Sequence, residues 1–444
     1  MFSLLNHSSI RRRGARTICY PGSRLSSAFG VGCCHWIAIS VFWPGASVSA
    51  QEALRSSMAG DAAAEAERVQ FQSMAYTIKS GDFILQVTPS LEVDWNDNVN
   101  LTKTDPESDF ILSPHLVLDA HYPIGMRNEL LLSVDVGYNK YFNHDELSAW
   151  YLSSGSQLSF NVYIKDLLIN LHDRFQYIQD PAQNAAVSGT GSYGTYENTA
   201  GLSGTWNLED VTLTLGYDHQ NTESLASQFN DVNSSSEMAT AQAGLKLLPK
   251  LTVGVEGSAS FMSYEEALLN DNQEYSIGVY GQWQPDSFLS VKPRLGYTVF
   301  DSSQTSTSIK AGNLTSWYAD LSLTHQVTKF LTYSLSIGHE IQPGIESDAI
   351  EDSYIRPNLT WNIINGVVLN TSLFYEHGSE GGGQQASLLE SNFDWYGGQL
   401  SLSYSPMKRL HVSLNYRLTL RSSDAALDEY KQNMVGLQIA YTPE

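Results

Sequence analysis

The histidines of this chain are its best candidates for acid–base or nucleophilic chemistry, and they are widely scattered. Those from His115 to His411 fall on many different segments, whereas a hydrolase of the Ser-His-Asp type needs its members in one compact cluster. His339-Glu340 and Glu376-His377 place an imidazole beside a carboxylate, but neighbouring residues of a strand point to opposite faces. No nucleophile motif stands beside either pair, so the sequence predicts no catalytic residues and no enzyme activity.

The cysteines and the acidic runs offer no cofactor site. All three cysteines, Cys19, Cys33 and Cys34, lie in the first fifty residues. The rest of the chain therefore has no thiol for a disulfide, a thiolate-bound metal or a nucleophile. Acidic runs such as 105–109 and 346–352 lack the regular oxygen-ligand spacing of a calcium loop. We expect neither a metal ion nor another cofactor.

The overall charge excludes one class of partner. Asp and Glu outnumber Lys and Arg by 47 to 25, which gives a formal net charge of −22. Binding to a nucleic acid depends on positive charges that replace counterions at the phosphates, so no nucleic-acid partner is expected. The acidic runs could concentrate cations or bind divalent ions shared with lipopolysaccharide. The alternative is that they form only a solvated surface.

The elements that must position the charged residues are long segments of alternating apolar and polar residues. Val211–Tyr217, Leu251–Phe261 and Leu410–Leu420 each keep their apolar residues on one parity, as strands with one apolar face do. The two longer segments are about twice the usual strand length of a soluble protein. They have the length that a tilted strand needs to cross a bilayer. The sequence predicts an all-β fold, a transmembrane antiparallel up-and-down β-barrel.

Connections between these segments alternate in length. Short turns are predicted at 123–126, 165–166, 207–210, 249–250, 285–287, 329, 365–366 and 406–409. Longer polar loops are predicted at about 96–108, 143–148, 179–194, 222–236, 265–273, 301–312, 342–352, 378–390 and 422–428. These turns and loops predict about eighteen strands, with sixteen as the alternative, and place both ends of the barrel on the short-turn side. In such barrels the short turns face the periplasm and the long loops face outside.

Strand parity also separates residues expected inside the barrel from those expected on its outer face. The charged residues predicted to line a pore are Asp119, Asp135, Arg174, Glu256, Lys292, Arg294, Asp320, Arg356, Arg417 and Arg421. An aromatic girdle beside the short turns is predicted from Tyr122, Trp206, Trp283, Trp361 and Tyr404, and one near the long loops from Trp95, Tyr217, Phe261, Tyr375 and Trp395. A polar interior of this size forms an aqueous channel. The alternative is that the charges pair across strands and only stabilise the wall.

The first part of the chain differs from the rest. Residues 1–50 have the pattern of a cleaved export signal, with basic residues at Arg11–Arg13, an apolar stretch and small residues at Val48–Ala50. The alternatives are a single membrane-anchoring helix and a lipoprotein anchor on Cys33. Residues 51–82 are Ala-rich and predict a periplasmic leader, helical or disordered, ahead of a barrel at 83–444. The alternative for this segment is a plug in the lumen or a periplasmic docking element. A β-propeller also repeats at about forty residues, but its strands would be shorter.

Two stretches at the start of the barrel resemble a β-barrel porin family of Gram-negative-type bacteria. They are Thr88–Val99 (TPSLEVDWNDNV) and the hairpin that runs from Leu112 to Tyr141, and the general pattern extends over 83–444. Some members of that family lie beside genes for exopolysaccharide synthesis and export. The end of the chain departs from the pattern. Such barrels commonly finish on an aromatic residue, whereas Tyr441 is followed by Thr-Pro-Glu.

These features predict an exported outer-membrane porin-like channel for hydrophilic solutes. The resemblance adds the exit of an exopolysaccharide as a candidate role. The expected partners are outer-membrane lipid and lipopolysaccharide, the barrel-assembly machinery and, for the exit role, periplasmic polysaccharide-export components. The alternative function is a surface structural or adhesion barrel, with an occluded lumen and acidic loops that bind a partner.

Overall fold

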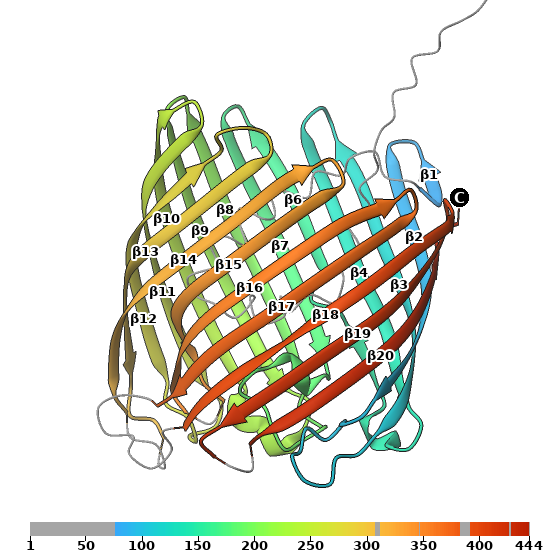
Figure 1. Ribbon diagram of the computed structural model, residues 1–444. Coiled ribbons are helices and arrows are strands. Elements are labelled where there is room, and N and C mark those ends of the chain that lie inside the picture. Colours follow the sequence, from blue (N-terminus) through green and yellow to red (C-terminus); the bar gives the residue numbers. More distant parts are fainter. Residues whose placement is uncertain (1–75, 307–310, 346, 382–390, 426–427, 444) are drawn as a thin grey trace, which may run out of the picture. The chain divides into compact units, whose positions relative to one another are not determined.

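The computed structural model describes residues 76–306, 311–345, 347–381, 391–425 and 428–443, and the export signal predicted for 1–50 lies outside them. Most of these residues form antiparallel strands within a single sheet (Figure 1). The sheet closes on itself because its first long strand, β2, pairs with its last strand, β20. The predicted all-β, up-and-down barrel is confirmed.

The strands are named here in chain order. They are β1 Ile78–Ser80, β2 Phe83–Asn96, β3 Asp109–Ile124, β4 Asn128–Tyr141, β5 Ala149–Leu152, β6 Gln157–Ile164, β7 Leu167–Ile178, β8 Thr195–Leu208, β9 Val211–Ser224, β10 Ser234–Leu248, β11 Leu251–Tyr264, β12 Asn272–Trp283, β13 Leu289–Ser302, β14 Asn313–Thr328, β15 Leu331–Pro343, β16 Ala349–Ile364, β17 Val367–Glu380, β18 Ser391–Met407, β19 Leu410–Ser423 and β20 Tyr430–Tyr441. β5 and β6 together form one strand of the wall, because both pair with β4 on one side and β7 on the other. β1 is a short strand beside the start of β2. The wall therefore has eighteen strands, as predicted.

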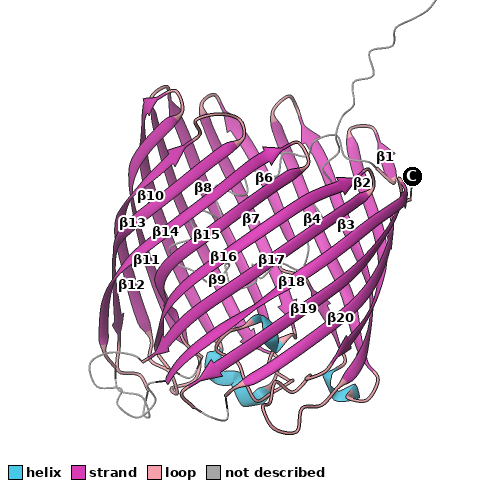
Figure 2. Ribbon diagram, in the orientation of Figure 1, coloured by secondary structure: helices cyan, strands magenta, loops and turns pink. Residues whose placement is uncertain are grey.

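Short and long connections lie at opposite ends of the barrel. The predicted short turns and long loops all occur between the expected strands. In Figure 1 the short turns lie along one rim, with β1 and the C-terminal end, and the long loops lie along the other. The 3-10 helices η3 (Asp145–Leu147), η4 (Pro181–Gln183) and η5 (Ser227–Val232) belong to long loops (Figure 2). Among the described residues no helix is long and apolar enough to span a bilayer.

The tight turns of the short-turn rim need unusual backbone angles. Gly366, between β16 and β17, has a φ of 80°, which glycine adopts freely because it has no Cβ. Lys165 and Glu209 occupy comparable positions in their own turns, with φ of 58° and 51°. These left-handed conformations are strained for residues that carry a side chain. Such turns fix the register of the strands that they join.

The seam of the barrel lies between β2 and β20 and is extended by a hairpin. Ser90–Asn96 of β2 pairs with β20, and beyond that pairing β1 covers Phe83–Leu85 at the start of β2. The hydroxyl of Thr77 donates a hydrogen bond to the carbonyl of Pro443 at 2.9 Å. Among the described residues, strand structure begins at Ile78, within the stretch 51–82 that the sequence assigned to a helical or disordered leader. The part of that leader before residue 76 lies outside the described residues.

Candidate functional site: the bore of the barrel

Burial alternates along the strands and separates an apolar outer face from a polar inner face. On β11, Val255 is 56% exposed, whereas the next residue, Glu256, is 7% exposed. Across the wall many large aliphatic and aromatic side chains are exposed, and most buried residues are Ser, Thr, Asn, Gln or charged. In a closed barrel the buried polar parity faces the bore. The bore is therefore the candidate functional site.

The charged residues predicted to line a pore share strand faces with buried polar residues. Arg174 on β7, for example, lies two residues from His172 and Gln176, both of which are buried. The same holds for Asp119, Glu256, Lys292, Arg294, Asp320, Arg356, Arg417 and Arg421 on their own strands, whereas Asp135 shares its face of β4 with the buried residues Leu131, Gly137 and Tyr141. Their part in conduction stays a prediction. Their contacts show how the bore is built.

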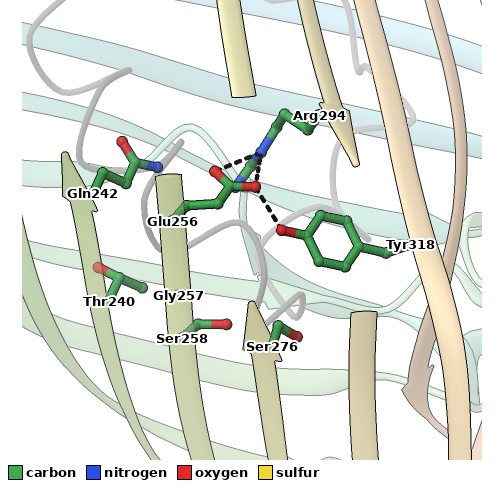
Figure 3. A pocket seen from close by; sticks show the side chains of 8 residues that line it. All are labelled: Thr240, Gln242, Glu256, Gly257, Ser258, Ser276, Arg294 and Tyr318. Atoms are coloured by element: carbon green, nitrogen blue, oxygen red, sulfur yellow. Dashed lines mark hydrogen bonds and ion pairs between the residues drawn. The ribbon is translucent and has the colours of Figure 1, made fainter. Parts of the chain in front are cut away.

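Glu256 on β11 is the centre of a compact cluster on the inner face (Figure 3). Its carboxylate accepts hydrogen bonds from Nε of Arg294 at 3.0 and 3.1 Å and from the hydroxyl of Tyr318 at 2.7 Å. The other side chains that surround it are polar or small: Thr240, Gln242, Gly257, Ser258 and Ser276. Arg294 comes from β13 and Tyr318 from β14, so the cluster links three strands of the wall. The charge of Glu256 is balanced within it.

A second cluster of the same composition lies on β14, β16 and β17. Arg356 donates from Nε to the carboxylate of Glu376 at 3.0 Å, and its guanidinium lies 4.4 Å from the ring centre of Tyr354. Tyr354 donates from its hydroxyl to Asp320 at 3.2 Å. Burying a charge is costly unless the charge is paired, and the Arg356–Glu376 pair meets that condition. The sequence analysis did not assign Glu376 to the inner face. The available signal was its position next to Tyr375, which was expected on the outer face, because neighbouring residues of a strand point to opposite faces.

The loop between β7 and β8, residues 179–194, folds into the bore. Asp180 forms an ion pair with Arg417 of β19, with 2.8 Å between Oδ2 and Nη1. Arg421 of the same strand donates from Nε to the backbone carbonyl of Ala185 at 2.9 Å. Several strands separate β7 and β8 from β19 in either direction around the wall. Arg417 and Arg421 therefore hold the loop across the interior of the barrel.

An apolar cluster, called the seat cluster below, completes the attachment of this loop. It consists of Leu101, Ala182, Ala185, Ile350, Phe374, Phe393, Trp395 and Tyr430. Leu101 belongs to loop 97–108 and the two alanines to loop 179–194, whereas the other members come from β16, β17, β18 and β20. Apolar side chains are unfavourable in a water-filled bore. Covering them favours the inward fold of both loops.

Trp395 corrects one prediction from the sequence. It was expected on the outer face in the girdle near the long loops, but it is 1% exposed and belongs to the seat cluster. Its ring centre lies 4.0 Å from that of Phe374, and its Nε1 donates to the hydroxyl of Tyr430 at 3.2 Å. The sequence does not show which apolar residues a distant loop will cover, so Trp395 was assigned to the wrong face.

The other predicted girdle aromatics are exposed. They are Tyr122, Trp206, Trp283, Trp361 and Tyr404 beside the short turns, and Trp95, Tyr217, Phe261 and Tyr375 toward the long loops. Exposed rings at both ends of an apolar outer face suit the two interfaces of a bilayer. Their contact with lipid stays a prediction.

The wall between β6 and β9 contains a buried polar network that sequence reasoning did not find. Nε2 of His172 lies 2.6 Å from the carboxylate of Asp218, and its Nδ1 lies 2.8 Å from Oδ1 of Asn170. Asn170 donates to Asn161 at 2.8 Å. The contact between His172 and Asp218 passes over Gly201, where a Cβ would lie 2.7 Å from Nε2 of His172 and closer still to Asp218. Only glycine fits at this position of β8.

The network does not have the geometry of a hydrolase. A nucleophile must lie within hydrogen-bond reach of the histidine that activates it. In the described part of the chain, no serine or threonine hydroxyl hydrogen-bonds to His172, and its two ring nitrogens contact Asp218 and Asn170. No group of three or more His, Cys, Asp or Glu side chains that could hold a metal ion occurs among the described residues.

His144 joins the first two long loops. Its Nδ1 lies 3.0 Å from Asp109 at the start of β3, and its Nε2 lies 2.9 Å from Glu107 in loop 97–108. Desolvation lowers the pKa of His144, but the hydrogen bonds to the two carboxylates outweigh it and raise the pKa above its ordinary value. Protonation of His144 therefore strengthens the contact between loops 97–108 and 142–148.

Similarities to known proteins are confined to the fold. No family model matches this chain, and no curated protein sequence matches it. It is similar to the structure of OccK5 (OpdH) from Pseudomonas aeruginosa, with 10% identity and a TM-score of 0.45 over 83% of this chain and 100% of that one. It is also similar to the structure of a BenF-like porin from Pseudomonas fluorescens, with 10% identity and a TM-score of 0.47 over 81% of this chain and 98% of that one. At such identities and TM-scores, the strand pairing and not the similarity establishes the barrel.

Proposed function

We propose that this protein is an outer-membrane channel through which hydrophilic solutes cross the bilayer. The observation that carries the proposal is the closed wall of eighteen strands, apolar outside and polar inside. The outer face suits lipid and the inner face suits water. A barrel of this strand number leaves room for an aqueous passage. Its short turns then face the periplasm, and outer-membrane lipid, lipopolysaccharide and the barrel-assembly machinery are the proposed partners.

Loop 179–194 restricts this passage. It lies inside the barrel, held by Arg417 and Arg421 on one side and by its own strands on the other. A solute must pass between the loop and the remaining wall, so the loop limits the size of what crosses. Polar side chains of the wall replace part of the solute's hydration there. The charged residues act through charge and hydrogen bonding and form no covalent intermediate.

Recordings from planar lipid bilayers test the proposal. The purified protein should give stepwise increases in current. The double variant Asp180→Asn/Arg417→Gln, which removes the ion pair that holds the loop, should give a larger or less steady conductance. Asp394→Asn serves as the matched control, because Asp394 lies on the outer face and contacts His377 and Tyr375 there. The absence of current at any voltage would contradict a channel.

A specific observation favours a second candidate, a surface barrel with an occluded lumen. The loops at the long-loop end contact one another as well as the wall. Tyr193 packs edge-on against Phe229, with ring centres 5.1 Å apart, and Gln228 donates to Ser192 at 2.9 Å. If these contacts close the bore, the acidic loops serve to bind a partner. An occluded barrel would conduct only as the Asp180→Asn/Arg417→Gln variant, in which the ion pair that holds loop 179–194 is absent. A channel would conduct as the wild type, with its loops in place.

The exit of an exopolysaccharide gains no support from the contacts or the similarities described above. The seat cluster and loop 179–194 occupy part of the bore, and nothing in their chemistry selects a polysaccharide over another hydrophilic solute. The proposal is therefore limited to hydrophilic solutes as a class.

A further inference from the structure

Four carboxylates lie on adjacent strands of the inner face. Glu92 and Asp94 belong to β2, Asp119 to β3 and Asp135 to β4, and they are called the carboxylate strip below. Glu92 accepts a hydrogen bond from the amide of Asn415 at 3.0 Å, and Asp119 accepts one from the hydroxyl of Ser133 at 2.7 Å. These donors are neutral, so they bring no positive charge to Glu92 or Asp119.

The arginines of the inner face are already engaged elsewhere. Arg294 bonds Glu256, Arg356 bonds Glu376, and Arg421 lies 3.6 Å from Glu380. Arg417 acts electrostatically on Asp94 but forms its ion pair with Asp180. In the described residues, no lysine or arginine forms an ion pair with a member of the carboxylate strip. Arg294, Arg356 and Arg421 are therefore paired with carboxylates outside the strip, and Arg417 lies between Asp180 and Asp94.

Unsatisfied polar groups lie beside the strip. Ser90, on the same face of β2, is 7% exposed, and its hydroxyl has no hydrogen-bond partner in the described structure. Nδ1 of His115, on the residue directly opposite in β3, also has none, nor does Oδ1 of Asp135. Buried polar groups are normally hydrogen-bonded. The hydroxyl and the imidazole can each donate or accept, and the ionised carboxylate accepts. These groups can therefore bind the waters of a hydrated cation or a solute that carries N–H donors.

We infer that the channel conducts cations in preference to anions, and that the carboxylate strip is where cationic groups of a solute are held. This inference rests on the proposed function and names the charge class of its solutes. Charged side chains that line a pore raise the local concentration of ions of opposite sign, and rings of Asp and Glu are the usual means of cation selection. The class comprises alkali cations and small organic solutes that bear ammonium or guanidinium groups.

The reversal potential in a KCl gradient across a planar bilayer measures this preference. The wild-type channel should reverse on the side expected for K⁺ permeation. The quadruple variant Glu92→Gln/Asp94→Asn/Asp119→Asn/Asp135→Asn keeps the shape and hydrogen-bonding capacity of the strip and removes its charge. It should shift the reversal potential toward zero. High salt should weaken the wild-type preference, because ions screen the carboxylates.

The matched control is Glu237→Gln/Asp394→Asn. It removes two carboxylates from the outer face, where each contacts a histidine, and should leave the reversal potential unchanged. Each single variant of the strip should produce part of the shift, which keeps the test decisive if the quadruple variant does not fold. Current without cation preference, or a preference that survives removal of the strip, would overturn this inference alone. No current in the wild type would overturn the channel and the preference together.

Discussion

The two ends of the barrel are built differently. At one end, turns such as 165–166 and 365–366 join the strands directly, and exposed aromatic residues such as Trp361 lie beside them. At the other end, loops 97–108 and 179–194 fold inward onto the seat cluster, and the largest buried side chain there is Trp395. A buried tryptophan packed against loops is thus a feature of the long-loop end, although Trp95 at that end is exposed like Trp361.

For the proposed channel, this difference indicates where solutes would be discriminated. The short-turn end has no element that enters the bore among the described residues, so it affects the strand register and not the passage. The long-loop end narrows the passage with a loop that is held by ion pairs and apolar contacts. In the proposed channel, selection by size would occur at the long-loop end, and the wall between the two ends would contribute charge.

The largest expected effect comes from Trp395→Ala. This change empties the centre of the seat cluster, and removal of a buried tryptophan typically costs about 3–5 kcal/mol of the free energy of unfolding. Trp361→Ala, at the short-turn end, should cost far less because Trp361 is exposed on the outer face. Denaturant unfolding of both variants in lipid vesicles measures the difference. Equal losses would mean that the two ends are held together in the same way.

A smaller effect is expected in the wall that joins the two ends. Gly201→Ala would push His172 and Asp218 apart and leave buried polar groups unpaired, at a cost of about 1–3 kcal/mol. Gly204→Ala is the matched control on the same strand, since its added Cβ would meet nothing closer than Leu167 Cδ1 at 3.9 Å. Chemical denaturation again provides the measurement. A Gly204→Ala variant as unstable as Gly201→Ala would refute the role given to the His172–Asp218 contact.

The short-turn end should tolerate, and even gain from, a substitution to glycine. Lys165→Gly relieves the left-handed backbone at this turn and should raise the free energy of unfolding by up to about 1 kcal/mol. Asp166→Gly, at the next position, has no such strain to relieve and should not stabilise the barrel. The same denaturation curves decide the point. A loss of stability in Lys165→Gly would show that the strain is compensated by contacts of the lysine.

The smallest effect concerns pH and the long-loop end. Because its folded-state pKa is raised, His144 stabilises the loop contact fully below its ordinary pKa of about 6.5. That contribution is lost as the pH rises through the higher folded-state value. For partly exposed pairs it should amount to about 0.2–1 kcal/mol. The stability difference between the wild type and His144→Gln should therefore be larger at pH 5.5 than at pH 8.5. A difference independent of pH would rule out this role for His144.

The architecture was predictable because its signals are local. Alternation within Leu251–Phe261 reveals a strand without reference to any other segment, and the turn at 365–366 reveals where two strands meet. Repetition of these signals along the chain gives the number of strands. Because every strand has one apolar and one polar face, these strands predict a closed barrel. The strand β1 escaped prediction because three residues are too few to show a period.

The interior of the barrel was predictable only in part. Parity indicated the inner faces of Arg294 and Arg417, but their partners come from other segments that parity does not connect to them. Ala185 and Arg421 are 236 residues apart in the chain, and no local pattern links them. The apolar alanines within loop 179–194 were the one available signal that this loop is not simply exposed to solvent.

The seam between β2 and β20 constrains how the molecule is made. β2 and β20 lie near opposite ends of the described chain, so the barrel can close only after the last strand has been synthesised. Contacts this distant in sequence form slowly. Until they form, both strands present unpaired edges that could join other chains. The short hairpin of β1 protects part of one such edge from the beginning of assembly.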